Sequence, residues 1–253
     1  MKKNKYAIYT SINNNYDQLA DHKNDDKFDF FVFTDDELKA SNWSSVPFQK
    51  TFKNVIDTNR YAKIKVPNFI YKNYDYSVYV DGNIFLKEKF FQKVKILFEN
   101  DNFFIGANLH PRFNCVFQDL VELQRVGILD GYSALAWAKK ISELGIFKNS
   151  LYHECNIILR KHHDYVGQFC DTWWEYFKSG YGRDQPAFRI ARFKHPQMHI
   201  KSLELGDIRD SKNLFANCFI HKKKKSKIIR LKKRLKSIIN FSEMEFKFYI
   251  NQM

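Results

Sequence analysis

Three short apolar runs, each followed at once by polar residues, limit this chain to folds that are built around a sheet. The runs are Tyr6–Ile12, Phe28–Phe33 and Tyr76–Val80, and they lead into Asn13–Asn15, Thr34–Asp36 and Asp81–Asn83. Short apolar runs bounded by turn-forming residues are typical of buried strands. Strands with polar side chains at their ends are how doubly wound nucleotide-binding sheets begin. The sequence therefore predicts an α/β fold.

Further periodic segments follow these runs. The predicted helices are residues 57–70 with a boundary at Pro67, Lys89–Asn100, most of Gln118–Ile146, and Tyr165–Phe177. The predicted later strands are Phe103–Asn108 and Asn156–Arg160. A chain of 253 residues, 44% of them apolar, is long enough for one sizeable core. The sequence has no Gly-x-Gly-x-x-Gly, which disfavours an ordinary dinucleotide-binding fold.

The C-terminal tail, residues 222–253, carries most of the excess positive charge. It contains eleven Lys and Arg against Glu243 and Glu245, a net +9 that leaves +5 of the total +14 for residues 1–221. Apolar residues at helical spacing within residues 226–239 predict a basic amphipathic helix. We therefore expect one main domain, residues 1–221, and a tail that contacts an anionic membrane surface through residues 222–239.

No segment predicts secretion or a membrane span. The apolar run Tyr6–Ile12 is too short for a signal peptide, and no run approaches the roughly 20 residues that cross a bilayer. The four cysteines are scattered without a Cys-x-x-Cys pair, so we expect reduced thiols. We expect a cytoplasmic protein, peripheral on the inner face of the cytoplasmic membrane.

The segment Asp81-Gly-Asn83 is the first candidate for chemistry. Two oxygen-bearing side chains separated by a glycine can turn toward one divalent ion bound to phosphate oxygens. Mg²⁺ and Mn²⁺ favour oxygen ligands, often one or two carboxylates together with substrate phosphates. The same residues are also typical of a type I′ or related turn.

The context of this segment resembles the GT-A glycosyltransferases. Asn59-Arg-Tyr-Ala-Lys63 ahead of Tyr79-Val-Asp-Gly-Asn-Ile84 is similar to their Arg-bearing helix and the strand that ends in a metal-binding Asp-x-Asp. The resemblance implies a Rossmann-like α/β fold, in which a mixed, mostly parallel sheet is flanked by helices. It also implies that Asp81 and Asn83 hold Mn²⁺ or Mg²⁺, with Arg60 and Lys63 facing the diphosphate of a nucleoside-diphosphate sugar, UDP-sugar favoured. Asn83 stands where these enzymes have a second Asp.

Other landmarks follow in the order that this resemblance requires. Ile8–Tyr16 resembles the strand and loop that hold the base and ribose, which makes Thr10 and Tyr16 candidate donor contacts. Tyr152–Arg160 is similar to the segment that lines the sugar pocket and contributes Glu154 and Asn156. Arg183-Asp-Gln185 resembles the Asp-Gln element near the reacting carbon. Phe219-Ile-His-Lys222 resembles the region of a late histidine, which makes His221 a metal ligand and Lys222 a diphosphate contact.

Three further motifs resemble a glycosyltransferase-like family of bacterial surface-polysaccharide loci and plant cell-wall proteins. They are Phe30–Asp36, His110-Pro-Arg112, and Trp173-Trp174 together with Arg183–Gln185, and the resemblance covers roughly residues 5–222. It implies a transferase that acts on a glycan or lipid-linked glycan in capsule or lipopolysaccharide synthesis. His110 and Arg112 are candidate contacts to the donor sugar or the acceptor.

The implied mechanism assigns a role to two carboxylates. Glycosyl transfer passes through an oxocarbenium-like state while a nucleoside diphosphate departs. A metal and basic side chains stabilise the negative charge of the leaving group. Asp184 or Glu154 would position the acceptor hydroxyl or take its proton.

Several of these residues also fit structural roles. Asp184 fits the cap of a helix that begins near Pro186. Trp173 and Trp174 fit either the core or a sugar platform. Two other classes of function remain: a non-catalytic GT-A-like protein that binds glycan or partner proteins, and a nucleic-acid-binding protein that uses the basic tail. We expect no nucleic acid, because the charge lies outside the main domain.

Overall fold

The structure, a computed structural model, describes residues 6–219 apart from 15, 18, 23–24, 36, 38–41, 101, 147–150 and 181. Its strands are β1 Tyr6–Ser11, β2 Phe28–Phe33, β3 Ser44–Val46, β4 Tyr76–Val80, β5 Ile84–Leu86, β6 Ile105–Leu109, β7 His153–Lys161, β8 Ile200–Ser202 and β9 Ala216–Cys218. Its helices are α1 Val55–Lys65, α2 Asn68–Asn73, α3 Glu88–Asn100, α4 Val116–Arg125, α5 Gly131–Glu143, α6 Asp164–Ser179 and α7 Asp184–Lys194.

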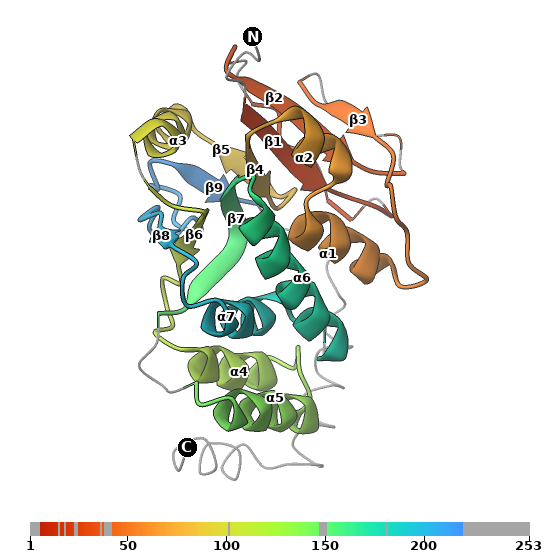
Figure 1. Cartoon of the computed structure of the whole chain (residues 1–253), viewed down its shortest axis with the longest axis vertical. Helices are drawn as coiled ribbons and strands as arrows, with labels where there is room; N and C mark the ends of the chain where they lie inside the picture. Colours follow the sequence, from red (N-terminus) through yellow and green to blue (C-terminus); the bar gives the residue numbers. More distant parts are fainter. Residues whose placement is uncertain are drawn as a thin grey trace.

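One large sheet with the order β3-β2-β1-β4-β7-β6-β8 forms the centre of the molecule (Figure 1). Its neighbouring strands are parallel except where β7 pairs, because β7 runs antiparallel to both β4 and β6. A separate antiparallel pair joins β5 to β9. The predicted α/β fold with a mixed, mostly parallel sheet flanked by helices is confirmed.

Alternate side chains of the central strands enter two different cores. Tyr9 and Tyr79 face a core that includes side chains of α1, α4, α5, α6 and α7. Ile8 and Val78 face the other core, with α3 and the β5–β9 pair. Because both faces are covered, these strands are apolar on both sides, as is usual for parallel strands. Figure 1 shows α4 and α5 side by side at one end, next to α7.

The order of the strands creates a switch point between β1 and β4. From β1 the chain continues to β2 and β3 on one side, and it then returns to β4 on the other side of β1. In open α/β sheets, ligands bind in the crevice outside the carboxyl ends of the strands at such a point. Thr10 in β1 and Asp81 after β4 therefore lie where this topology places a ligand site.

The helix predicted over residues 57–70 is two helices in the structure. α1 ends at Lys65, Val66 has a positive φ of 49°, and α2 starts directly after Pro67. Proline lacks a backbone N–H and restricts the residue before it, which explains the break. The short strands β3, β5, β8 and β9 were not predicted from the sequence.

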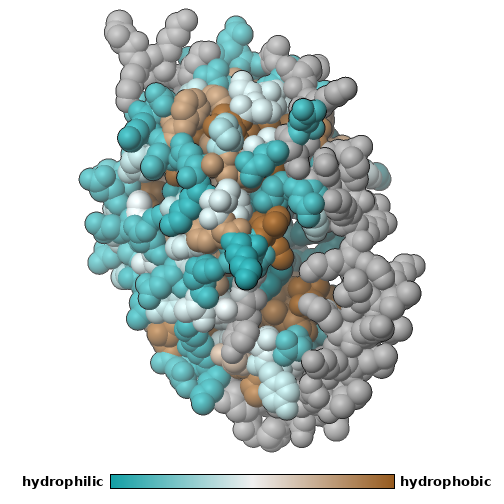
Figure 2. Space-filling model, turned by 90° about the vertical axis from the view of Figure 1, so that its right-hand side faces the viewer, coloured by the Kyte–Doolittle hydropathy of each residue, from teal (hydrophilic) through white to brown (hydrophobic). Residues whose placement is uncertain are grey.

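The described residues on one face of the molecule are mainly polar (Figure 2). Figure 2 shows polar side chains over most of one face, with small apolar patches between them. No helix in the described part of the chain combines the length and apolar character that a membrane span requires. All four cysteines are free, as predicted. The predicted amphipathic helix in residues 226–239 lies outside the described residues, as does the whole tail from residue 222.

Candidate active site

The turn after β4 fixes the backbone of Asp81 at the edge of the sheet. Asp81 N–H donates to the carbonyl of Asn156 in β7 at 2.9 Å, and Ile84 N–H donates to the Asp81 carbonyl at 3.0 Å. A Cβ atom on Gly82 would lie 2.5 Å from Ile12 Cδ1, so glycine allows this close approach. Gly82 and Asn83 have no positive φ, and β4 and β5 belong to different sheets. The bond from Ile84 N–H to the Asp81 carbonyl closes a turn, so the segment is a turn, although not the type I′ turn of a β-hairpin.

Lys63 of α1 forms ion pairs with two carboxylates of the site, those of Asp81 and Asp184. Its ammonium lies 2.8 Å from Asp184 Oδ2 and 3.3 Å from Asp81 Oδ1. Only 2% of the Lys63 side chain is exposed. The hydroxyl of Tyr79 also donates to Asp81 Oδ1, at 2.9 Å. Residues from α1, β4 and α7 thus meet at the carboxyl end of β4.

Arg60 adds a second cation to Asp184. Its Nε atom lies 3.4 Å from Asp184 Oδ2. Burial by itself would raise the pKa of Asp184, but Arg60, Lys63 and Arg183 outweigh this effect and hold that pKa well below its usual range. Asp184 in turn raises the pKa of Arg60. Asp184 is therefore a fixed anion between cations.

The start of α7 differs from the expected cap. Asp184 is the first residue of the helix, and Arg183 occupies the N-cap position without a side-chain cap bond. The backbone carbonyl of Asp184 accepts a hydrogen bond from the indole N–H of Trp173 at 2.8 Å. Trp173 is fully buried, which assigns it to the core, whereas Trp174 is half-buried.

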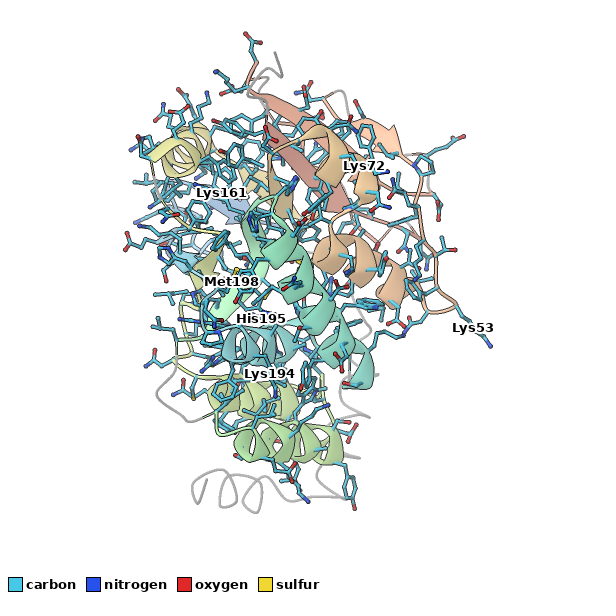
Figure 3. The ribbon with its side chains drawn as sticks, in the orientation of Figure 1. Lys53, Lys72, Lys161, Lys194, His195 and Met198 are labelled. Carbon is cyan, nitrogen blue, oxygen red and sulfur yellow. The ribbon has the colours of Figure 1, made fainter. Side chains whose placement is uncertain are left out.

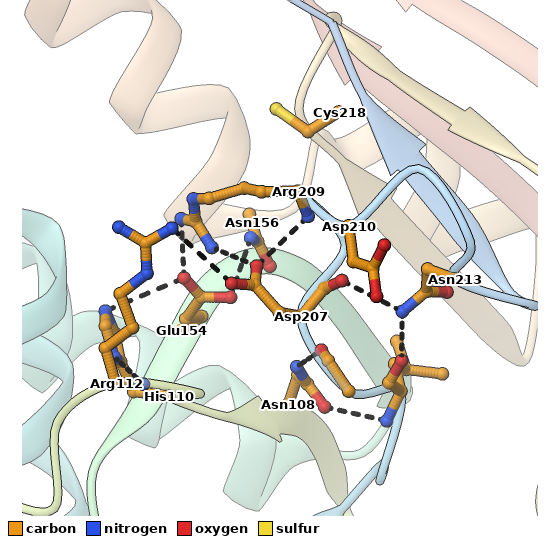
Figure 4. A network of polar contacts seen from close by, with 12 residues as sticks. Asn108, His110, Arg112, Glu154, Asn156, Asp207, Arg209, Asp210, Asn213 and Cys218 are labelled. Carbon is orange, nitrogen blue, oxygen red and sulfur yellow. Dashed lines mark hydrogen bonds and ion pairs between the residues drawn. The ribbon is translucent and has the colours of Figure 1, made fainter.

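A second polar cluster lies at the start of β7 (Figure 4). Glu154 is 1% exposed, and its Oε1 atom accepts from Arg209 at 2.7 Å. Its Oε2 atom accepts from the side-chain amide of Asn156 at 3.1 Å. Arg209 also donates to Asp207 at 3.1 Å, and Arg112 lies 3.5 Å from Asp207. Glu154 is therefore held by the segment that precedes β9.

His110 is neutral in this cluster. Its Nδ1 atom accepts from the backbone N–H groups of Arg112 and Phe113, so its proton is on Nε2, 3.6 Å from Glu154 Oε1. Burial, Arg209 and Arg112 lower the pKa of His110 to about 4. His110 can therefore donate a hydrogen bond near neutral pH but carries no charge.

Sequence reasoning missed Asp207 and Arg209. Both belong to the irregular segment between β8 and β9, and no motif or periodicity marks them. The one local signal is the alternation of charge in Asp207-Ile-Arg-Asp210, which predicts exposure rather than a contact with buried Glu154.

Among the buried polar atoms that have no hydrogen-bond partner in the described residues, four belong to elements around the site. They are Thr10 Oγ1, Asn59 Oδ1, Asn156 Oδ1 and Arg183 Nε. Buried polar atoms are normally paired, so each such atom calls for an explanation. A hydroxyl that can donate or accept, two amide oxygens that accept and a guanidinium N–H that donates suit the hydroxyl, amide and phosphate groups of a polar ligand.

The expected metal ligands are only partly available. Both contacts to the Asp81 carboxylate from described residues involve Oδ1, which leaves Oδ2 for a cation. The Asn83 amide N–H group donates to the Phe219 carbonyl at 2.7 Å and to Cys218 Sγ at 3.1 Å. In residues 6–219, where described, no group of three or more His, Cys, Asp or Glu side chains could hold a metal. His221 and Lys222 lie outside the described residues.

Two other residues that were predicted to contact the donor lie outside the cluster of ion pairs. Tyr16 lies in the loop after β1 and is 39% exposed. Gln185 is the second residue of α7 and is half-buried. The structure thus brings Arg60, Lys63, Asp81 and Asp184 into one cluster, and the backbone bond from Asp81 to Asn156 joins this cluster to the one around Glu154.

Comparison with known proteins gives fold-level similarity. No family model matches the chain, and neither does any curated protein. The WbbM bifunctional glycosyltransferase in its apo form matches with 14% identity and a TM-score of 0.49, over 80% of this chain and 39% of WbbM. This chain therefore spans well under half of the WbbM chain.

Two other solved structures match over more of their own length. The galactosyltransferase LgtC in complex with donor and acceptor sugar analogues matches at 12% identity and a TM-score of 0.40, over 78% of this chain and 72% of LgtC. Mouse xyloside xylosyltransferase 1 in its apo form matches at 10% identity and a TM-score of 0.45, over 78% and 84%.

Proposed function

We propose that this chain is a glycosyltransferase that moves a sugar from a nucleoside-diphosphate sugar to a glycan or lipid-linked glycan acceptor. One observation carries the proposal: Arg60, Lys63, Asp81 and Asp184 meet at the carboxyl end of β4, beside the switch point of the sheet. Cations held in a fixed position at such an edge suit the negative charge that develops on a departing diphosphate.

In this proposal Asp184 is a positioning residue. Its low pKa makes it a weak acceptor of protons at neutral pH, and its carboxylate holds Arg60 and Lys63 in place. Arg60, whose side chain is 29% exposed, contacts the diphosphate. Glu154, beside Asn156 and His110, orients the reacting sugar or the acceptor hydroxyl.

Asp81 is the proposed anchor of a divalent ion. Its Oδ2 atom and the phosphate oxygens of the donor would suffice for Mg²⁺ or Mn²⁺, which often use one or two protein carboxylates. Such an ion would supply further charge stabilisation at the leaving diphosphate. Asn83 and His221 complete the proposed metal set, and Lys222 adds a proposed diphosphate contact.

The unpartnered atoms suggest how the rest of the donor is bound. Thr10 and Asn59, with Tyr16 nearby in the sequence of the β1 loop, are proposed to contact the nucleoside, with uridine favoured. Asn156 and Arg183, together with His110, Arg112 and Gln185, are proposed to contact the donor sugar or the acceptor. A role in capsule or lipopolysaccharide synthesis, at the inner face of the cytoplasmic membrane through residues 222–239, is part of the same proposal.

Isothermal titration calorimetry tests this proposal. UDP, GDP and CDP are titrated into the wild type and Asp81→Ala, with Mn²⁺ and with EDTA. We expect metal-dependent binding of UDP that weakens about tenfold or more in Asp81→Ala, because the ion loses its carboxylate. Asp171→Ala is the matched control, since Asp171 is an exposed carboxylate paired with Lys65. Nucleotide affinity that stays the same with EDTA and in Asp81→Ala contradicts the metal role. Failure to bind any of the nucleotides contradicts the donor assignment.

A non-catalytic glycan- or partner-binding protein is the second candidate. Two observations favour it: the amide of Asn83 is already bonded to Phe219, and the ammonium of Lys63 already neutralises Asp81. Turnover of a panel of UDP-sugars separates the two functions. Nucleotide binding without hydrolysis or transfer of any sugar supports this second candidate.

A further inference from the structure

Three aromatic side chains from separate segments meet beside α1. The ring of Tyr61 in α1 lies 5.0 Å from that of Trp174 in α6, at an interplanar angle of 83°. Phe52, in the loop before α1, lies 5.3 Å from Tyr61 and 5.4 Å from Trp174. All three side chains are half-buried. Part of each aromatic side chain is therefore accessible from outside.

Two exposed lysines place their ammonium groups over the faces of these rings. Lys50 Nζ lies 5.0 Å from the ring centre of Tyr61 and 5.3 Å from that of Phe52. Lys178 Nζ lies 5.6 Å from the centre of Phe52 and 5.8 Å from that of Trp174. These five residues are called the aromatic–lysine ledge below. It combines apolar ring surface with cationic hydrogen-bond donors.

The charge around the ledge is mainly positive. Lys178 also pairs with Asp57 at 2.5 Å. Lys50 has no carboxylate partner among the described residues, and Lys53 projects outward from the same loop (Figure 3). A ligand with carboxylate groups would therefore find at least one ammonium group that is not engaged by an acid.

The loop that carries Phe52 is fixed in place. Phe52 N–H donates to Thr58 Oγ1 at 2.8 Å, and the Thr58 hydroxyl donates back to the Phe52 carbonyl at 3.4 Å. This loop therefore needs little reordering to receive a ligand, and a surface that is already ordered binds at a lower entropic cost.

The ledge lies next to the candidate active site along the chain. Tyr61 directly follows Arg60, which contacts Asp184. Trp174 and Lys178 belong to the second half of α6, and α7 begins with Asp184 soon after α6 ends. The ledge and the candidate active site therefore both draw on α1 and on the consecutive helices α6 and α7.

We infer that the aromatic–lysine ledge binds an acidic glycan chain, with uronate carboxylates on the lysines and sugar rings against the exposed parts of the aromatic side chains. This inference rests on the proposed function, because it makes the ledge the docking surface of the acceptor. Aromatic side chains combine apolar contact area with fixed geometry. Ammonium–carboxylate hydrogen bonds are stronger than neutral ones, which gives preference for an acidic chain.

Calorimetry with short oligogalacturonates, and with neutral maltooligosaccharides of equal length, tests the ledge in the absence of nucleotide. Trp174→Ala is expected to weaken oligogalacturonate binding about tenfold or more, because it removes a central aromatic contact. The double variant Lys50→Gln, Lys178→Gln is expected to abolish the preference for the acidic chain. Because Trp174 also stacks on Phe177, circular dichroism melting checks its fold, and the lysine variant keeps the test independent of that change.

Matched controls come from α5. Tyr132→Ala removes an aromatic side chain that is 59% exposed, and Lys139→Gln removes a lysine whose side chain is 64% exposed. Neither change is expected to alter binding of the oligogalacturonate. Equal binding by all variants, no binding by the wild type, or equal affinity for the neutral chain would overturn the inference.

A parallel titration of UDP with Mn²⁺ separates this inference from the proposed function. The ledge variants are expected to bind the nucleotide as the wild type does. If nucleotide binding fails while oligogalacturonate binding still depends on the ledge, the proposed transfer is wrong and the glycan surface stands. If nucleotide binding holds and oligogalacturonate binding is independent of the ledge, the inference is wrong and the proposed function stands.

Discussion

The ammonium of Lys63 lies 2.8 Å from the carboxylate of Asp184, and this ion pair joins α1 to the first turn of α7. Both side chains are almost fully buried, and Lys63 also contacts Asp81. Buried charges remain ionised only when they are paired and hydrogen-bonded. Asp184, which is proposed to hold Arg60 and Lys63 in place at the diphosphate site, therefore also links two helices that pack on the sheet.

Replacing Lys63 tests this double role. Lys63→Met should lower the free energy of unfolding by about 3–5 kcal/mol, because Asp184 loses its nearest cation while it stays buried. Urea denaturation followed by circular dichroism measures the change. The double variant Lys63→Met, Asp184→Leu should lose less than the single variant, since no unpaired carboxylate remains. Lys139→Met, at an exposed i, i+4 pair with Glu143, is the control. A loss as small as in the control would contradict the account.

His110 predicts a loss of stability in mild acid. Burial lowers its pKa to about 4, against an ordinary value of 6.5. Between these two values the unfolded chain binds a proton that the folded protein does not, so the contribution of His110 to stability falls as the pH falls from about 6.5 toward 4. His110→Gln should flatten the pH dependence of the unfolding free energy in this window. If the unfolding free energy of His110→Gln depends on pH as steeply as that of the wild type, the prediction is refuted.

Gly82 tests the close packing under the Asp81 turn. A Cβ atom at this position meets Ile12 Cδ1 at 2.5 Å and Cγ1 at 2.8 Å. Gly82→Ala should therefore destabilise the protein by about 1–3 kcal/mol through overpacking. Adding Ile12→Val removes the Cδ1 atom, so it should restore part of the loss. Thermal unfolding of the two singles and the double gives the coupling energy, and simple additivity would rule out this contact as the cause.

Arg209 tests whether the segment before β9 holds Glu154. Arg209→Met removes the 2.7 Å bond to Glu154 and the 3.1 Å bond to Asp207. We expect a loss of about 1–3 kcal/mol, because Glu154 keeps its burial but loses its charged donor. Arg125→Met breaks an exposed i, i+3 pair with Glu122 and should cost less than about 1 kcal/mol. Equal losses in both variants would show that the Glu154 contact adds nothing beyond a surface pair.

The sequence predicted the elements that carry a complete apolar pattern. Phe28–Phe33 and Tyr76–Val80 were predicted with the bounds that the structure has, because they are buried on both faces and bounded by polar residues. The strands β3, β5, β8 and β9 have three residues each, which is too short for a periodic signal. Their pairing depends on tertiary contacts that no local pattern records.

The sequence predicts which residues belong to the site better than it predicts which ion pairs they form. Arg60, Lys63, Asp81 and Asp184 were singled out by motif, and the structure brings them together. In the structure, however, the two cations pair with the two carboxylates, and the order of the motifs does not show this. Arg209 was missed because its partner, Glu154, lies far away in the sequence and the segment between β8 and β9 has no regular structure.

In the proposed function, Asp81 anchors a divalent ion at which the diphosphate of a sugar nucleotide binds. Its most direct test is a crystal structure with UDP and Mn²⁺, in which anomalous scattering of manganese locates the ion. We predict an anomalous peak at coordination distance from Asp81 Oδ2, with the diphosphate between the ion and Arg60. An anomalous peak elsewhere, or a nucleotide bound away from the carboxyl ends of β1 and β4, would contradict the account.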